Sequence, residues 1–571
     1  MNRVKFISWA VISLFLFLLF GLLDLEVIQT KKYLRLGDKN CIRLLAQSGC
    51  RGKILDRAGN VIVDSKLSYD LMILPQEGEG QDKIMLAASR ILDKSVGDLK
   101  ISYKKNFISG SMPIVIARNI GTKQAIALEE LKIEFPSIII QPNPLRHYPY
   151  SKLACHVLGY VSEIDRWRLT RLKDYGYKTK DIVGFGGVEE KYDYYLRQEE
   201  GGLSFEVDHR GRLMRQLGFQ PPVNGKDIQL TLDLKIQKII EDKLDYRKGA
   251  IVIMDPYTGE VMAMVSSPGF DPGVFAEKQN SVIAELFNNS SAPLMNRAIS
   301  SAYPAGSVFK VVVAAGGLES KKINSNTSFI CRGSLLVGRK EFACWSIHDS
   351  QNLIAAITHS CNTFFYKTGL LLGGQSIHDY ALKFGFSRPS GLELSHEVSG
   401  FIPSPLQRKI NQFRNWYEGD TANLSIGQGD VSVTPLQITR MMAVFANDGY
   451  LVTPYIIKTI DGRDVSMYQK RIEKISIKPE TIEQIKEGLR YVVSSPTGTG
   501  NVLSSLNISV AGKTGTAQAP PSQPHAWFAG FFPFEKPKYV ICVFLEHGGP
   551  GYVSCVAAKQ IIEEMINQGL I

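Results

Sequence analysis

The chain has few cysteines and no dense run of basic residues. Eight cysteines in 571 residues are too few for a disulfide scaffold, although Cys41 and Cys50 are close enough in sequence to pair in an oxidising compartment. The formal net charge of +11 is spread thinly, without the lysine and arginine runs that grip nucleic acid. We therefore expect no nucleic-acid partner, but a mild attraction to acidic lipid or wall polymers.

Long hydrophobic runs are also scarce, because only Phe6–Leu23 is uncharged and apolar over about 18 residues. Arg3 and Lys5 precede this run and Asp24 and Glu26 follow it, so the positive-inside rule places the N-terminus in the cytoplasm. A cleaved signal peptide is the alternative, but no small-x-small cleavage site follows the run. We expect a single-pass membrane anchor, with the rest of the chain outside the cytoplasm.

Two bodies are expected after the anchor. The breaker cluster Pro221–Lys226 is the best boundary between them. The sequence before this boundary indicates strands, turns and charged helices, and it contains no group of residues typical of a nucleophile and its base. We therefore predict an anchor over residues 1–25, a non-catalytic body over 26–224 and a catalytic body over 225–571.

The catalytic body has the pattern of an α+β domain. Two apolar stretches, Ala250–Met254 and Glu260–Val265, flank a turn and predict a β-hairpin. Further strands are expected at Lys513, over Ala526–Phe532 and over Tyr539–Leu545, and a helix near 553–567 closes the chain. These elements predict an antiparallel sheet flanked by helices.

A nucleophile and its base are predicted at Ser307 and Lys310. They are three residues apart on an expected helix, so a neutral Lys310 amine could take the hydroxyl proton of Ser307. The breaker Tyr303–Gly306 precedes them and an apolar run follows, which would bury Lys310 and depress its pKa. The alternative is a capping serine and a solvated lysine.

Two further motifs follow in the order typical of a serine acyltransferase that needs no histidine. Ser360 offers a hydroxyl for proton relay, and Asn362 an amide that can hold a substrate amide. The stretch Lys513–Thr516 can bind a carboxylate and an oxyanion. Alone, Asn362 might be a turn residue and Lys513 part of an ordinary edge strand, but the order and flanks of the three motifs favour the catalytic interpretation.

A possible metal site lies between the first two motifs. Cys331, Cys344, His348 and Cys361 have the spacing C-x12-C-x3-H-x12-C, which suits tetrahedral zinc with no open position. The alternative is a Cys331–Cys344 disulfide, with Cys361 as a buried filler and His348 exposed. The position of Cys361 between two expected catalytic side chains favours a structural zinc.

These motifs resemble the penicillin-recognising serine transferases, and specifically the class B penicillin-binding proteins. The resemblance covers almost the whole chain. Its supporting stretches are Arg51-Gly52, Asp56-Arg57, Gly187–Glu189 and Glu206–Arg212 in an elongated pedestal domain, and Asn296–Ile299, Thr421–Gly429, Cys344-Trp345 and His525–Gly530 in the transpeptidase domain. The last two stretches are most similar to the members that act in cell elongation.

The resemblance implies a role for each motif residue. Ser307 would attack the D-Ala-D-Ala amide of a peptidoglycan stem peptide, with Lys310 as base and Ser360 as relay, and would be trapped by β-lactams. Asn362 would hold the donor peptide. Lys513 and Thr514, with Gly515 beside them, would bind the terminal carboxylate of the donor peptide. The N–H groups of Ser307 and Thr516 would form the oxyanion hole.

The resemblance also implies partners and alternatives. No cofactor is needed for the chemistry, and a membrane glycosyltransferase of the SEDS family, with the elongation machinery, is the expected partner. Some relatives carry zinc near the second motif with a mixed carboxylate, histidine and cysteine set, from which three cysteines and a histidine depart. The alternatives are a division-specific transpeptidase, a non-catalytic scaffold, a β-lactamase and a penicillin sensor. A β-lactamase has no use for an anchor and a long pedestal, and a penicillin sensor usually carries several membrane segments.

Overall fold

The computed structural model describes residues 2–33, 42–74, 80–107, 113–207, 213–244, 247–466 and 472–571. An apolar helix, α1 (Asn2–Leu23), opens the chain and ends in the short π-helical segment η1 (Asp24–Ile28). By length and composition, Val4–Ile28 is the one helical stretch of the described residues that could cross a membrane, and an 18-residue window within it has a mean hydropathy of 2.6. Cys41 and the end of the Glu206–Arg212 stretch lie outside the described residues, so the Cys41–Cys50 pair stays a prediction.

The contacts divide the chain into two compact units. Unit 1 comprises Met1–Arg51, Ser65–Leu145 and Gln198–Gly225, and unit 2 comprises Gly52–Asp64, Arg146–Arg197 and Lys226–Ile571. Each unit is built from segments that are not contiguous in the sequence, so the domain boundary at Pro221–Lys226 stays a prediction.

Unit 1 contains a helical layer on a small sheet. Its elements are β1 (Ile42–Gln47), most of β3 (Val61–Ile73), α3 (Gly80–Leu92), α4 (Val96–Asn106), β4 (Ile114–Ile120), α5 (Thr122–Glu130), η2 (Leu131–Ile133), most of β5 (Ile138–His147), β8 (Gly201–Val207) and β9 (Leu213–Gln220). Leu71, Ile84, Leu99 and Leu128 are buried together between the α3–α5 helices and strands β3 and β4. A second sheet has the antiparallel order β1-β8-β9.

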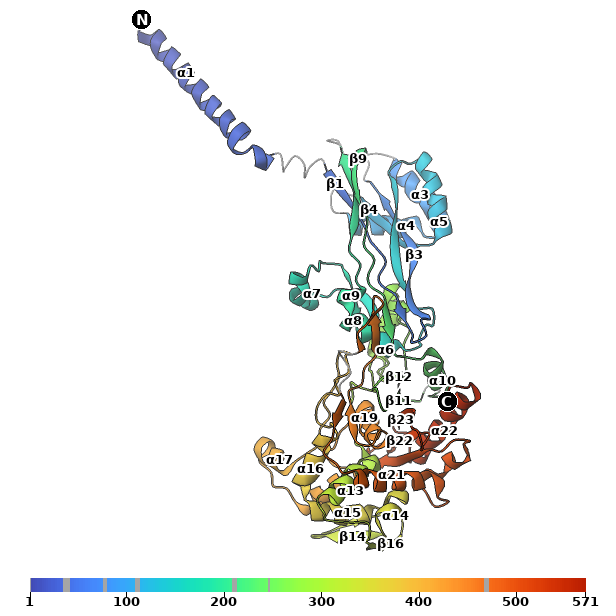
Figure 1. Cartoon of the computed structure of the whole chain (residues 1–571). Helices are drawn as coiled ribbons and strands as arrows, with labels where there is room; N and C mark the ends of the chain where they lie inside the picture. The colour runs from blue at the N-terminus through green and yellow to red at the C-terminus, as the bar shows by residue number, and fades with distance from the viewer. Residues whose placement is uncertain are drawn as a thin grey trace. The chain divides into compact units, whose positions relative to one another are not determined.

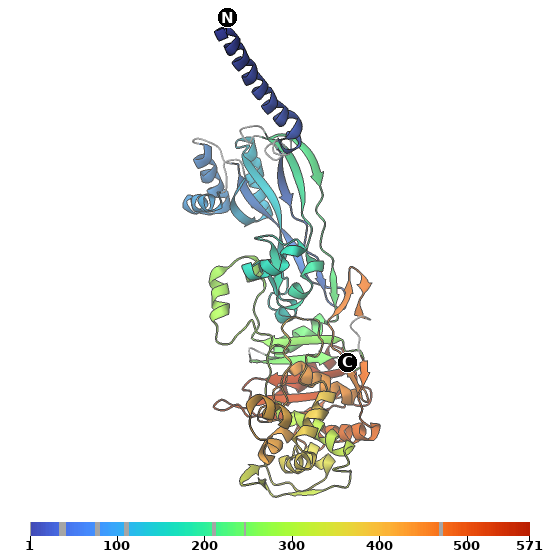
Figure 2. The same cartoon turned by 90° about the vertical axis from the view of Figure 1, so that its left-hand side faces the viewer.

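Unit 2 is organised around one sheet that positions the three sequence motifs. The strands β11 (Gly249–Met254), β12 (Val261–Ser267), β21 (Ala511–Ala517), β22 (His525–Phe532) and β23 (Tyr539–Leu545) are antiparallel, in the order β12-β11-β23-β22-β21. This arrangement confirms the predicted hairpin, the later strands and the α+β class. Strands β11, β12, β22 and β23 are labelled in Figure 1, and Figure 2 gives a second view of the same sheet.

Helices cover both faces of the five-stranded sheet, which is why its strands are apolar on both sides. The helices α10 (Leu234–Leu244) and α22 (Tyr552–Asn567) pack on one face, and α22 confirms the predicted closing helix. The turn η4 (Gly306–Phe309), α13 (Lys310–Glu319) and α19 (Pro435–Ala446) belong to the other, larger core. The helix α21 (Pro479–Ser494) packs on the edge strand β21.

The remaining elements of unit 2 are short. They are β2 (Ile54–Leu55), α6 (Cys155–Leu158), β6 (Tyr160–Glu163), α7 (Arg166–Leu172), η3 (Lys173–Tyr175), β7 (Ile182–Phe185), α8 (Gly187–Lys191), α9 (Asp193–Leu196), β10 (Ile228–Leu230), α11 (Gly273–Ala276), α12 (Asn280–Asn288), β13 (Phe329–Cys331), β14 (Ser334–Val337), β15 (Lys340–Ala343), β16 (Asp349–Gln351), α14 (Leu353–Thr358), α15 (Asn362–Leu372), α16 (Gly374–Lys383), α17 (Pro405–Gln412), α18 (Glu418–Ser425), β17 (Tyr450–Val452), β18 (Ile457–Ile460), β19 (Arg463–Asp464), β20 (Ile472–Lys474) and η5 (Asn501–Ser505).

A buried ion pair holds the Gly187–Glu189 stretch in unit 2. The Arg146 Nε atom lies 2.7 Å from Glu189 Oε1, and both side chains are almost fully buried. The same guanidinium also donates to the Gly52 carbonyl at 2.7 Å. Because both charged groups are buried, loss of either side chain would remove this ion pair and deprive the other charge of that compensation.

Glu189→Gln should therefore lower the free energy of unfolding of unit 2 by about 3 kcal/mol, since the Arg146 guanidinium would remain buried without its carboxylate. Denaturant unfolding followed by tryptophan fluorescence measures this change. Glu163→Gln is the matched control, because Glu163 pairs with Lys278 at an exposed position and should cost under about 1 kcal/mol. Equal midpoints for the two variants would contradict a structural role of the buried pair.

Candidate active site

Ser307 lies on a tight turn in front of a buried helix. It belongs to the 3₁₀ turn η4, half-buried, and Lys310 begins helix α13 with a fully buried side chain. Gly306 has a φ of +56°, and a side chain there would approach the Thr516 carbonyl oxygen to 2.8 Å. A residue with a Cβ would thus be strained and crowded at this position, so glycine permits the turn that presents Ser307 beside the edge strand.

Lys310 joins the first motif to the second. Its Nζ donates to the Ser360 carbonyl at 2.7 Å and to Asn362 Oδ1 at 2.7 Å, and lies 3.2 Å from Ser360 Oγ. Among the described residues, the Ser307 hydroxyl forms no hydrogen bond with Lys310. Burial lowers the pKa of Lys310 to about 7, and the weaker influence of the Cys344 and Cys361 thiols opposes that change.

The second motif is held in a strained backbone conformation. Ser360 is buried and has a φ of +53°, a left-handed value that a non-glycine residue rarely adopts. Asn362 begins helix α15, and its side-chain Nδ2 donates to the Ala343 carbonyl at 3.2 Å. Both Ser360 and Asn362 therefore face the Lys310 amine from one short connection between α14 and α15.

The third motif occupies the free edge of the sheet. Strand β21 is last in the sheet order, and the Thr516 carbonyl accepts from Gln428 Nε2 at 3.2 Å. In an antiparallel strand the N–H and C=O of one residue point to the same side, so the Thr516 N–H also faces the free edge. The parity of the strand places the N–H of Thr514 on that side as well.

Lys513 is a second buried amine close to the first. Its Nζ donates to the Thr514 carbonyl at 3.1 Å. Its pKa is lowered well below the usual value, first by burial and then by the charge of Lys310. An arriving carboxylate would offset both effects, which suits an anion-binding role. Gly515 lies where a side chain would come within 3.1 Å of Val308 and Trp527 atoms, so glycine keeps the strand close to η4.

Three supporting residues were not predicted as site residues. Gln428 binds the Thr516 carbonyl, and Trp527 Nε1 donates to the Pro304 carbonyl at 3.0 Å, just before the nucleophile turn. Both lie in stretches that carried the family resemblance, which was the available signal. The third is Thr499, whose hydroxyl lies 2.7 Å from that of Thr514. Nothing in its local sequence indicated this contact.

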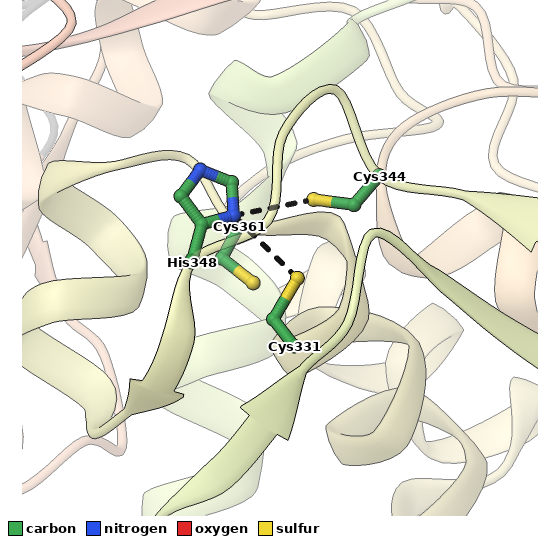
Figure 3. A group of neighbouring side chains, drawn as sticks. All are labelled: Cys331, Cys344, His348 and Cys361. Atoms are coloured by element: carbon green, nitrogen blue, oxygen red, sulfur yellow. Dashed lines mark hydrogen bonds between the residues drawn. The ribbon is translucent and has the colours of Figure 1, made fainter.

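The four predicted metal ligands converge on one point, as Figure 3 shows. The ligand atoms of Cys331, Cys344, His348 and Cys361 all lie within 4.8 Å of one another. His348 Nδ1 is 3.5 Å from the sulfur atoms of both Cys331 and Cys344. Cys331 and Cys344 are free thiols, so the alternative of a disulfide between them is not found in the structure.

The cysteine cluster contacts the second motif directly. The backbone N–H of Asn362 donates to Cys344 Sγ at 3.2 Å, and the Thr363 hydroxyl lies 3.3 Å from Cys331 Sγ. Three thiols and one imidazole nitrogen are a donor set that suits tetrahedral zinc. Whatever the cluster binds would therefore act on the backbone that carries Ser360 and Asn362.

Comparison with known proteins identifies the class. Residues 249–567 match the penicillin binding protein transpeptidase domain, and residues 46–230 match the penicillin-binding protein dimerisation domain. The chain therefore belongs to the penicillin-binding proteins that combine a dimerisation domain with a transpeptidase domain. Within that family it is similar to the peptidoglycan D,D-transpeptidase MrdA of Haemophilus influenzae, with 30% identity over 96% of this chain and 89% of the relative.

Solved structures point to the same group of proteins. A complex between penicillin-binding protein 2 and MreC from Helicobacter pylori is 26% identical, covers 93% of this chain and 99% of the solved chain, and has a TM-score of 0.81. A structure titled "Structural coordination of polymerization and crosslinking by a peptidoglycan synthase complex" is 29% identical over 98% of this chain and 97% of the solved chain, with a TM-score of 0.73. The likeness extends over both domains.

Acylation by penicillin should depend on pH through Lys310. Because burial lowers the pKa of Lys310 to about 7, the neutral base is lost as the pH falls below that value. The second-order acylation rate constant should then drop about tenfold per pH unit below the pKa and level off above it. Stopped-flow measurements with a fluorescent penicillin from about pH 5 to about pH 9 test this dependence.

Lys310→Arg is the control for the pH dependence. A guanidinium keeps its proton throughout this range, so the variant should acylate poorly at every pH. A flat profile for the unmodified protein, or near-normal acylation by the variant, would contradict the assignment of Lys310 as base.

Proposed function

We propose that this protein is a peptidoglycan D,D-transpeptidase that cross-links stem peptides during cell elongation. The observation that carries the proposal is the buried Lys310 amine, which binds both Ser360 and Asn362 next to the nucleophile turn. The similarity to proteins named MrdA and penicillin-binding protein 2 supports the elongation role over the division role.

In the acylation step, the Ser307 hydroxyl attacks the carbonyl carbon of the D-Ala-D-Ala amide. The hydroxyl proton passes to neutral Lys310 as the new C–O bond forms. Ser360, 3.2 Å from Lys310 Nζ, returns the proton to the departing nitrogen as the C–N bond breaks and D-alanine leaves. A neighbouring stem amine then attacks the ester and restores Ser307. A β-lactam follows the first half of this path and stays bound as an ester.

The free edge of β21 is the proposed binding surface for the donor peptide. Lys513 and Thr514 would bind the terminal carboxylate, with Gly515 allowing close approach, and the Asn362 amide would hold the peptide. The outward N–H of Thr516, together with the N–H of Ser307, would stabilise the oxyanion. Gln428 supports this assignment, because its bond to the Thr516 carbonyl fixes the orientation of that residue.

The proposed organisation places the site outside the cytoplasm. Residues 1–25 would form the cytoplasmic tip and inner-membrane anchor, 26–224 the non-catalytic pedestal, and 225–571 the periplasmic transpeptidase domain. Arg3 and Lys5 before the apolar run support this orientation. We propose a SEDS-family glycosyltransferase and the elongation machinery as partners. The similarity to a penicillin-binding protein 2 solved with MreC and to a chain of a peptidoglycan synthase complex supports assembly with partner proteins.

Ser307→Ala should abolish covalent labelling by penicillin and cross-linking activity. The fold should survive, because the half-buried Ser307 hydroxyl lies in the η4 turn and caps no helix, so its loss should cost about 1 kcal/mol at most. Intact-mass spectrometry after penicillin treatment checks the adduct, and thermal unfolding checks the fold. A penicilloyl adduct on the alanine variant would disprove the nucleophile assignment, and failure of the unmodified protein to form any adduct would favour a non-catalytic scaffold.

We further propose that Cys331, Cys344, His348 and Cys361 hold a structural zinc ion. The donor set and the convergence of the four ligand atoms fit tetrahedral zinc without an open position. Such an ion supplies no chemistry to the acyl transfer, which needs no cofactor in this family. It would restrain the connection that carries Ser360 and Asn362, since Cys344 accepts the N–H of Asn362.

Purified protein should contain about one zinc per chain, and His348→Ala should bind it less tightly. The variant should also be acylated more slowly, because Ser360 and Asn362 would be held less firmly while Ser307 is untouched. Elemental analysis, a count of accessible thiols and the acylation rate measure these effects. Absence of stoichiometric zinc in protein purified without chelator, or oxidation of Cys331 and Cys344 to one disulfide, would rule the site out.

A further inference from the structure

The loop that follows helix α21 contacts the third motif through one threonine. The Thr499 Oγ1 atom lies 2.7 Å from the Thr514 Oγ1 atom, and either hydroxyl can be the donor. Thr514 is buried and Thr499 is half-buried, so water competes poorly for this bond. Thr499 belongs to none of the three motifs, and no other hydrogen bond of its hydroxyl is found among the described residues.

The backbone holds Thr499 firmly in this position. Its N–H donates to the Thr358 carbonyl at 3.3 Å, two residues before Ser360. Asn501 Nδ2 donates to the Ser495 carbonyl at 2.9 Å and closes the loop. Gly498 has no room for a side chain, since a Cβ there would meet the Val492 carbonyl oxygen at 2.3 Å. These contacts fix the backbone at Thr499, from which its hydroxyl reaches Thr514.

The pair of hydroxyls shares its protons in one of two ways. If Thr514 donates to Thr499, its proton is directed away from any ligand on the sheet edge. If Thr499 donates to Thr514, the Thr514 proton is free to reach an anion, and the anion strengthens both bonds in turn. A carboxylate beside Lys513 therefore selects the second arrangement, and only a hydroxyl at position 499 can supply the supporting proton.

We propose that Thr499 is a specificity-determining residue that directs the Thr514 hydroxyl toward the terminal carboxylate of the ligand. It acts through Thr514, without touching the ligand, and gives the site its preference for donor peptides and β-lactams with a free carboxylate. This inference rests on the proposed function, because it assigns the carboxylate to the Lys513 and Thr514 end of the site.

A comparison of penicillin G with its methyl ester separates this role from a structural one. The rate constant for acylation by penicillin G, divided by the rate constant for the methyl ester, measures the preference for a free carboxylate. Thr499→Val keeps the shape of the side chain and removes the hydroxyl, and should lower the ratio about tenfold, the size expected for one charge-assisted hydrogen bond. The rate constant for the methyl ester should change less than about threefold. Thr499→Ser keeps the hydroxyl, so this variant should have the same ratio as the unmodified protein.

Thr497→Val is the matched control. It removes a hydroxyl from the same loop, one that bonds to His359 Nε2 at 3.0 Å and not to Thr514, so the ratio should stay unchanged. Parallel loss of both rates in Thr499→Val, or an unchanged ratio, would overturn the inference while leaving the proposed function intact. Absence of acylation by either compound in the unmodified protein would instead refute the proposed function, and the inference with it.

Discussion

The site depends on one buried amine. Lys310 is fully buried, and none of the described carboxylates forms an ion pair with it, so its charged form is costly and burial lowers its pKa to about 7. The same amine bonds to Ser360 and Asn362, which joins the helix behind the nucleophile to the second motif. A base that is neutral near physiological pH and a rigid link between two motifs thus come from a single side chain.

Neighbouring residues hold the partners of the Lys310 amine in place. The strained backbone of Ser360 persists because neighbouring groups hold it, including the Thr499 N–H on Thr358 and the Cys344 sulfur on the Asn362 N–H. The edge strand β21 is held in the same way, by Gln428 at the Thr516 carbonyl and by Gly551 N–H at the Thr516 hydroxyl, 2.9 Å away. The positions of the catalytic side chains therefore also depend on hydrogen bonds from residues outside the three motifs.

Local patterns predicted the framework well. Alternation of apolar runs and turn residues indicated the hairpin of β11 and β12, and the last two strands and the closing helix lie close to their predicted bounds. The nucleophile turn was less accessible to such reasoning. A helix start was expected at Ser307, but the chain forms a 3₁₀ turn and α13 begins only at Lys310, because the η4 turn packs on the edge strand β21.

The sequence by itself determined which chemical groups are available, since the residue types and order of the motifs specify a serine nucleophile, buried amines and a thiol-imidazole set. Tertiary structure alone decided which of these groups meet. Lys310 bonds to Ser360, 50 residues away, and not to Ser307 among the described residues, and Thr499 reaches Thr514 across the segment that contains η5. Such contacts depend on how distant segments pack together, and no local pattern of propensity or period contains that information.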